Sequence, residues 1–226
     1  MRREYLLLRQ YRFGRFHDVL HWSQMNTQRE SLSVVVRELG IDNPSPRTGR
    51  IPKTRIEQFM NHGDIEVLGA VYAFITDERR SKVIEPSLQF EDYYQFVTRY
   101  YERCLREDPK SKWADSRYSA GHDLVGWFVS LWNDKEVPKS AIANLKAWLA
   151  QLYREGDEAL RNCLVTATLE HLFEHQKIRK YFADWEGDPV LGAAFAGAKE
   201  WVQGGGSTPL GKPESFRKAK AAERKS

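Results

Sequence analysis

The chain has 226 residues, with 35 basic and 31 acidic side chains, a formal net charge of +4 and 41% hydrophobic residues. Seven Trp, ten Tyr and eleven Phe exclude a wholly disordered chain, because these side chains can form one sizeable core or two small ones. Uncharged stretches such as 67–76 and 124–133 are about half as long as a membrane-spanning helix, so we expect no membrane partner. Two cysteines are too few for a disulfide framework and we recognise no secretory signal, which predicts a cytoplasmic protein.

The basic charge is concentrated at the two ends of the chain. Residues 1–15 contain five arginines and one glutamate, and residues 207–226 contain six bases and two acids. The intervening residues have 24 basic and 28 acidic side chains, a net charge of −4. The charge of the whole chain is therefore a poor argument for nucleic-acid binding.

Capping patterns place the helices of an expected N-terminal helical subdomain, residues 1–86. A Ser, Thr or Asp side chain at a helix start accepts a hydrogen bond from a free backbone N–H, and a glutamate three residues later completes a capping box. Such starts precede runs of apolar residues at three- and four-residue spacing, and Gly or Pro ends the runs. The starts are Thr27, Thr54 and Asp64, and the ends are Gly40, about Asn61 and Pro86.

The same spacing continues through residues 87–203 and predicts a C-terminal helical bundle. The segment 158–182 is apolar almost all round in its first half, so we expect it to be one central, buried helix. Residues 204–226 begin with three glycines and are predicted to be a flexible basic tail. Apart from an ambiguous segment, Tyr5–Leu8, no strand pattern appears, and the prediction is an all-α fold of about eight helices. The other expected helices of the bundle run from Phe90 to Leu105, from Asp115 or Ser116 to Trp132, from Ser140 to Gly156, and from Asp188 to about Trp201.

His171, Glu174 and His175 match the pattern H-x-x-E-H of inverted zinc proteases. Two histidines four residues apart lie on one face of a helix, and the glutamate is placed to act as a base. One alternative is therefore a metal-dependent helical hydrolase that uses His171, His175 and an acid such as Glu174 or Asp123. The other interpretation is a pair of histidines at the polar end of a buried helix, which needs no cofactor.

The two cysteines have different sequence surroundings. Cys163 lies next to Leu164 and Val165, where burial would raise its pKa and leave it inert. Cys104 has two arginines nearby and is expected to be the more reactive thiol. No histidine partner for Cys104 is implied by the sequence, so a nucleophilic role is not predicted.

Acidic residues gather in the C-terminal half and surround a tryptophan in the segment 184–186. An exposed aromatic anchor with charges around it is typical of a protein-binding patch, whereas a charge run alone is typical of a solvated helix face. The residues that we expect to bind a partner are Asp115, Asp123, Glu170, Glu174, Asp184, Trp185 and Glu186.

Two stretches carry a resemblance to a known family. The first reads DSRYSAGHDLVGWF from Asp115 and ends in LWND, and the second reads LEHLFEHQKIRKYFADW from Leu169 and is followed by DPVL. Over about residues 110–202 the chain is thereby similar to small all-helical bacterial immunity-type proteins, which are paired with secreted antibacterial toxins. The resemblance implies a cytoplasmic protein that inactivates one cognate protein toxin by binding it, without an active site or a small-molecule ligand.

Three functions stay open on the sequence. The first is an immunity protein that occludes its toxin through an interface of about 800 Å² per partner. The second is the metal-dependent hydrolase described above. The third is a nucleic-acid-associated regulator that uses the basic ends as clamps, although six bases in a flexible tail predict only salt-sensitive contact and no specific nucleic-acid binding.

Overall fold

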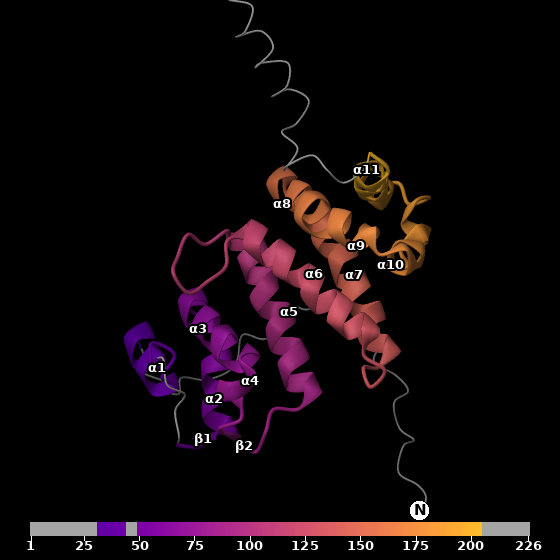
Figure 1. The fold of residues 1–226 in the computed structure, drawn as a ribbon. Coiled ribbons are helices and arrows are strands. Elements are labelled where there is room, and N and C mark those ends of the chain that lie inside the picture. The colour runs from indigo at the N-terminus through magenta and orange to yellow at the C-terminus, as the bar shows by residue number, and fades with distance from the viewer. Residues whose placement is uncertain (1–30, 44–48, 205–226) are drawn as a thin grey trace, which may run out of the picture. The chain divides into compact units, whose positions relative to one another are not determined.

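The computed structural model describes residues 31–43 and 49–204, which lie in one compact unit (Figure 1). Within these ranges it has ten helices when the continuous segment from α8 to α9 is counted once, and eight of them have at least seven residues. The all-α prediction is confirmed. The expected subdomain boundary at residue 86 stays a prediction.

The described residues contain two short strands. They are β1, Ile51–Pro52, and β2, Ile84–Glu85, which pair in parallel. The expected strand at Tyr5–Leu8, the capping box at Thr27 and all of the tail after residue 204 lie outside the described residues.

Helix α3 is the centre of the N-terminal part, where it packs against α1, α2 and α5. Asp64 begins α3 as predicted, because its carboxylate accepts a hydrogen bond from the backbone N–H of Glu66 at 2.9 Å. Gly40 ends α1 with a φ of 66°, a conformation that glycine adopts without steric cost. The four helices are α1 Leu32–Leu39, α2 Lys53–Met60, α3 Ile65–Thr76 and α4 Glu78–Ser81.

The helix start predicted at Thr54 is wrong, because α2 begins at Lys53 and Thr54 lies inside its first turn. The strand pair decides this start. The N–H of Ile51 donates to the carbonyl of Val83 at 2.8 Å, and the helix follows directly after Pro52, which has no side-chain acceptor to offer.

Helix α5 packs against α3 and against α6, so it joins the two halves of the described chain (Figure 1). Ser116, and not Asp115, begins α6, since its hydroxyl accepts from the N–H of Ser119. Asp157 begins α8 as predicted, because its carboxylate accepts from the N–H of Leu160. The start expected at Asp188 is too early: Asp188 accepts from the N–H groups of Val190 and Leu191, and α11 begins only at Leu191. The start expected at Ser140 is also wrong, because α7 begins at Lys139 directly after Pro138. The helices of this part are α5 Phe90–Glu107, α6 Arg117–Asn133, α7 Lys139–Glu155, α8 Glu158–Cys163, α9 Glu170–Glu174, α10 Gln176–Tyr181 and α11 Leu191–Gln203.

The expected single helix over 158–182 is wrong. Helix α8 passes through a π-helical segment, Leu164–Leu169, continues as α9 and ends at Glu174. The backbone of His175 is extended, with φ −83° and ψ 99°, and α10 begins after it. A short helical turn, Ala183–Trp185, then precedes α11.

Burial of apolar side chains accounts for the break. Ile178 and Phe182, which follow His175, are 1% and 0% exposed. The Phe182 ring lies 5.8 Å from the rings of both Phe128 and Phe173, so α10 returns its apolar residues to the core formed by α6 and α9. The gain from this packing exceeds the loss of a few backbone hydrogen bonds at the end of α9.

Basic side chains from other elements bind the C-terminal ends of several helices. The last carbonyl groups of a helix have no partner within it and carry partial negative charge. Arg80 donates to the carbonyl of Gly40 after α1 at 2.6 Å, and Lys146 donates to that of Tyr181 in α10 at 2.7 Å. Arg117 donates to a carbonyl at the end of α5 at 2.6 Å. These bases are therefore engaged in holding the fold together.

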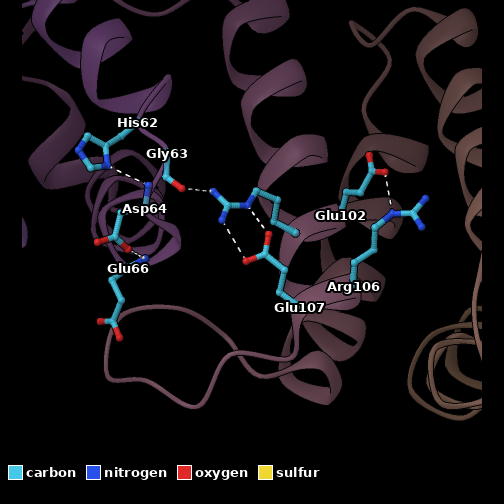
Figure 2. Close-up of polar contacts among 8 residues, drawn as sticks. His62, Gly63, Asp64, Glu66, Glu102, Arg106 and Glu107 are labelled. Carbon is cyan, nitrogen blue, oxygen red and sulfur yellow. Dashed lines mark hydrogen bonds and ion pairs between the residues drawn. The ribbon is translucent and has the colours of Figure 1, made fainter. Parts of the chain in front are cut away.

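In the turn between α2 and α3, a basic side chain again donates to a backbone carbonyl group (Figure 2). Arg103 of α5 donates to the carbonyl of Gly63 at 2.9 Å and pairs with Glu107 at 2.6 Å. Within the turn, the N–H of Asp64 donates to Nδ1 of His62 at 3.0 Å (Figure 2). The corner is thereby fixed to the C-terminal part of α5, the longest helix among the described residues.

Candidate partner-binding site

An open groove lies where α6 ends and α7 begins. Helix α6 stops at Asn133 because Asp134 is extended, and the Asp134 carboxylate accepts from the N–H of Glu136 at 2.9 Å. Pro138 precedes α7 and restarts the chain in a helical direction. This turn and Tyr181 of α10 enclose a cavity of about 650 Å³, which we call the α6–α7 groove.

The floor of the α6–α7 groove is apolar and its edge is charged. The Trp132 and Tyr181 rings lie 5.1 Å apart at an angle of 60°, and both side chains are half-buried. Ala143 is exposed within the groove. The apolar lining consists of Leu131, Trp132, Val137, Ile142, Ala143 and Tyr181, and the polar lining of Asn133, Asp134, Lys135 and Lys139.

Lys146 fixes the tyrosine side of the groove. Its Nζ lies 4.6 Å from the centre of the Tyr181 ring and forms an ion pair with Asp184 at 2.5 Å. Burial and the negative charge of Asp184 raise the pKa of Tyr181, so its phenol is neutral at physiological pH. The groove wall is therefore uncharged and held in one orientation.

The segment 184–186 does not form the exposed anchor that we expected. Trp185 is 4% exposed and packs edge-to-face on Phe182, with 4.8 Å between the ring centres. Asp184 pairs with Lys146, and Glu186 pairs with Lys199 of α11 at 2.9 Å. The tryptophan is needed in the core, and the two acids hold neighbouring helices.

Other predicted partner-binding residues lie around a pair of histidines on α6 and α9. The rings of His122 and His171 are 5.0 Å apart, and His171 Nδ1 lies 3.0 Å from the Glu174 carboxylate. Asp123 is next to His122, and its pKa is raised because nearby protein atoms displace water and because Asp115 repels its charge. Burial raises the pKa of Glu170 to about 7.

Asp115 has a structural role at the start of α6. Its carboxylate accepts from the Tyr100 hydroxyl at 2.8 Å, and its N–H donates to the same oxygen at 3.0 Å. Burial raises the pKa of Tyr100, so the phenol keeps the proton that it donates. The seven predicted residues therefore do not form one patch. They lie in the segment 184–186, around the histidine pair and at the start of α6.

The H-x-x-E-H pattern does not form the expected ligand pair. Because α9 ends at Glu174, His175 leaves the regular helix and no longer shares a face with His171 by helical spacing. Glu174 is bound to His171. Within residues 31–43 and 49–204, no three His, Cys, Asp or Glu side chains converge on a point that would suit a metal ion.

Both thiols are buried, and the expectation that Cys104 is the more reactive of the two is wrong. Burial raises the pKa of each cysteine to about 12, so both stay protonated near neutral pH. For Cys163, the burial and the raised pKa are as predicted. The arginines beside Cys104 in sequence point elsewhere, since Arg103 binds Gly63 and Glu107.

The groove residues were missed because helical spacing also predicts that they belong to the core. Trp132 and Ile142 continue the apolar faces of their helices, and only the turn between them leaves the space uncovered. The sequence signal for that space was the polar segment ending in Pro138.

Comparison of the chain with known proteins does not assign it to a family. No known protein family matches the chain, and no curated protein or solved structure shows significant similarity to it. In the described part of the chain, no helix is both long and apolar enough to cross a membrane. The basic ends on which the nucleic-acid hypothesis depends lie outside the described residues.

Proposed function

We propose that this protein binds another protein through the α6–α7 groove and that its biological role is to neutralise a bacterial toxin. The observation that carries the proposal is the open cavity of about 650 Å³ between an aromatic wall and an exposed alanine. Its size falls in the range of pockets that receive a large side chain or a small ligand. The toxin as partner comes from the sequence resemblance.

The chemistry of the groove favours an apolar anchor. Trp132 and Tyr181 offer two ring faces or edges, and Leu131 and Ile142 are each only 8% exposed beneath them. Aromatic and aliphatic side chains that fill such pockets contribute most of the binding free energy at protein interfaces. The surrounding surface then excludes water from the contact.

The edge of the groove favours an acidic neighbour beside that anchor. Lys135 and Lys139 both line the edge, while the single acid, Asp134, is occupied by the N–H of Glu136. A carboxylate on the partner would pair with either lysine and orient the anchor. The expected charge at the contact is therefore opposite to the acidic patch predicted from the sequence.

The first experiment tests neutralisation in growing cells. The product of the gene next to this one is expressed alone and together with this protein, and growth is recorded. We expect the neighbouring product to arrest growth and this protein to restore it. A harmless neighbour, or a neighbour that stays toxic during co-expression, would contradict the toxin as partner.

A pair of alanine variants then tests the groove. Ala143→Glu places a long charged side chain inside the groove, and Ala147→Glu makes the same change one turn later on the exposed face of α7, outside the groove. We expect Ala143→Glu to abolish protection and to weaken complex formation at least tenfold in calorimetry, and Ala147→Glu to behave like the unchanged protein. Equal behaviour of the two variants would place the contact elsewhere.

A further inference from the structure

A histidine pair joins three helices on the surface that α6, α9 and α11 form. The His122 ring of α6 lies 5.0 Å from the His171 ring of α9, at an angle of 49°. The His171 ring in turn lies 5.2 Å from the Trp201 ring of α11, edge to face. One imidazole therefore contacts both neighbouring helices.

Two acidic side chains lie next to the pair. Glu174 Oε1 lies 3.0 Å from His171 Nδ1. Asp123 is the acid beside His122, and its charge raises the pKa of His122, but burial and the charge of His171 lower that pKa overall. Burial raises the pKa of Glu170 on α9 to about 7, so this carboxyl group is partly protonated near neutral pH.

The other elements packed on α9 contribute mainly basic side chains. The π-helical segment Leu164–Leu169 carries no ionisable side chain, and α11 presents the Trp201 ring. Helix α10 carries three basic side chains. Helix α11 carries Glu200 and Lys199, and Lys199 pairs with Glu186.

We propose that His122 and His171 form a pH-sensitive latch that holds α6, α9 and α11 together at neutral pH and loosens when His122 takes up a proton beside His171. The proton comes from solvent, and no covalent bond changes. Two positive rings 5.0 Å apart repel each other, and the repulsion acts directly across the α6–α9 contact. The pair is a conformational device and binds no ligand.

The direction of the pH dependence follows from His122. Burial and the charge of His171 lower its pKa below the value of a free histidine. Between those two pKa values the unfolded chain binds more protons than the folded chain, so acid favours unfolding. The stabilising contribution is complete above about pH 6.5 and is lost as the pH falls through the lower pKa of His122.

Imidazole NMR of the full chain between pH 8 and pH 5 tests the latch. The protein is compared with His171→Gln and with His175→Gln, a control that removes an exposed histidine four residues away. We expect His122 to titrate below about pH 6.5, to move upward in His171→Gln and to stay in place in His175→Gln. A free-histidine titration of His122, or one unaffected by His171→Gln, would overturn the latch.

Thermal unfolding at pH 7.5 and pH 5.0 adds a second measurement. Removal of either member of the pair, by His122→Gln or His171→Gln, should reduce the loss of melting temperature on acidification, and the double variant should reduce it no further. His175→Gln should leave that loss unchanged. Equal acid sensitivity of all variants would mean that the pair is packed without acting as a latch.

Discussion

Near its N-terminal end, one face of helix α6 packs tightly on the π-helical segment, whereas its C-terminal end borders the open α6–α7 groove. Near the start, Gly121 lies so close to the π-helical segment that an added Cβ would be 2.9 Å from the Cβ of Ala167. Near the end, Trp132 is half-buried beside a cavity of about 650 Å³. Along one helix, the chain therefore passes from packing that tolerates no added atom to a surface that can receive one.

The comparison separates residues that build the fold from residues available for a partner. At the closed end, the side chain of Thr168 donates to the carbonyl of Gly121 at 3.0 Å, and Arg117 ties the start of α6 to the end of α5. At the open end, the charged side chains at the groove edge are Asp134 and Lys135, in the turn that ends in Pro138, and Lys139, the first residue of α7. Substitutions at the two ends should have opposite consequences for stability and binding.

The largest expected effect is at the closed end. Gly121→Val would place methyl groups against Ala167, and Cys163 Sγ lies only 3.3 Å from the position of the added Cβ. We expect a loss of about 3 kcal/mol in the free energy of unfolding, because overpacking forces the two helices apart. Urea unfolding measures the loss.

Gly126 provides the matched control on the same helix. No atom lies within 4 Å of the Cβ that would be added there. Gly126→Ala should stabilise the protein by about 0.5–1 kcal/mol, because alanine is the better helix former. If Gly121→Val were as well tolerated as Gly126→Ala, the tight packing of α6 on the π-helical segment would be contradicted.

A smaller effect is expected from the buried hydrogen bond beside that contact. Thr168→Val keeps the shape of the side chain and removes its donor to the carbonyl of Gly121. Thr168 is fully buried, so the carbonyl would lose a partner that water does not replace. We expect a loss of about 1–2 kcal/mol in urea unfolding, and Thr168→Ser, which keeps the hydroxyl, should lose less.

The smallest effect on stability is expected at the open end. Ala143→Glu adds a side chain where the structure leaves space, and Ala143 is exposed. The free energy of unfolding should change by less than about 0.5 kcal/mol, even though binding is expected to fail. A loss as large as that of Gly121→Val would show that the groove is part of the core and would remove the contrast between the two ends.

Helix starts were predictable wherever one side chain caps the next few residues. Asp64 and Asp157 each accept a backbone N–H two or three positions later, so the interaction is contained within the segment that predicts it. Thr54 failed because the pairing of β1 with β2, which joins residues more than 30 positions apart, fixes the chain just before α2.

The candidate site was less predictable than the helices. Trp185 has acidic neighbours in sequence, but the ring of Phe182 and the rest of the core bury it. Trp132 has apolar neighbours in sequence, yet the turn before α7 leaves it beside a groove. Exposure depends on which elements, distant in sequence, pack over a side chain, and the local sequence pattern does not predict those contacts.

By itself the sequence determined the all-helical class and the helix starts at Asp64, Ser116 and Asp157, because these depend on interactions within a few residues. Tertiary structure alone decided the break at His175, the burial of Trp185 and Cys104, the meeting of His122 with His171 and the opening beside Trp132. Each of these depends on contacts between helices, where burying one apolar surface determines which other surface is left to face water.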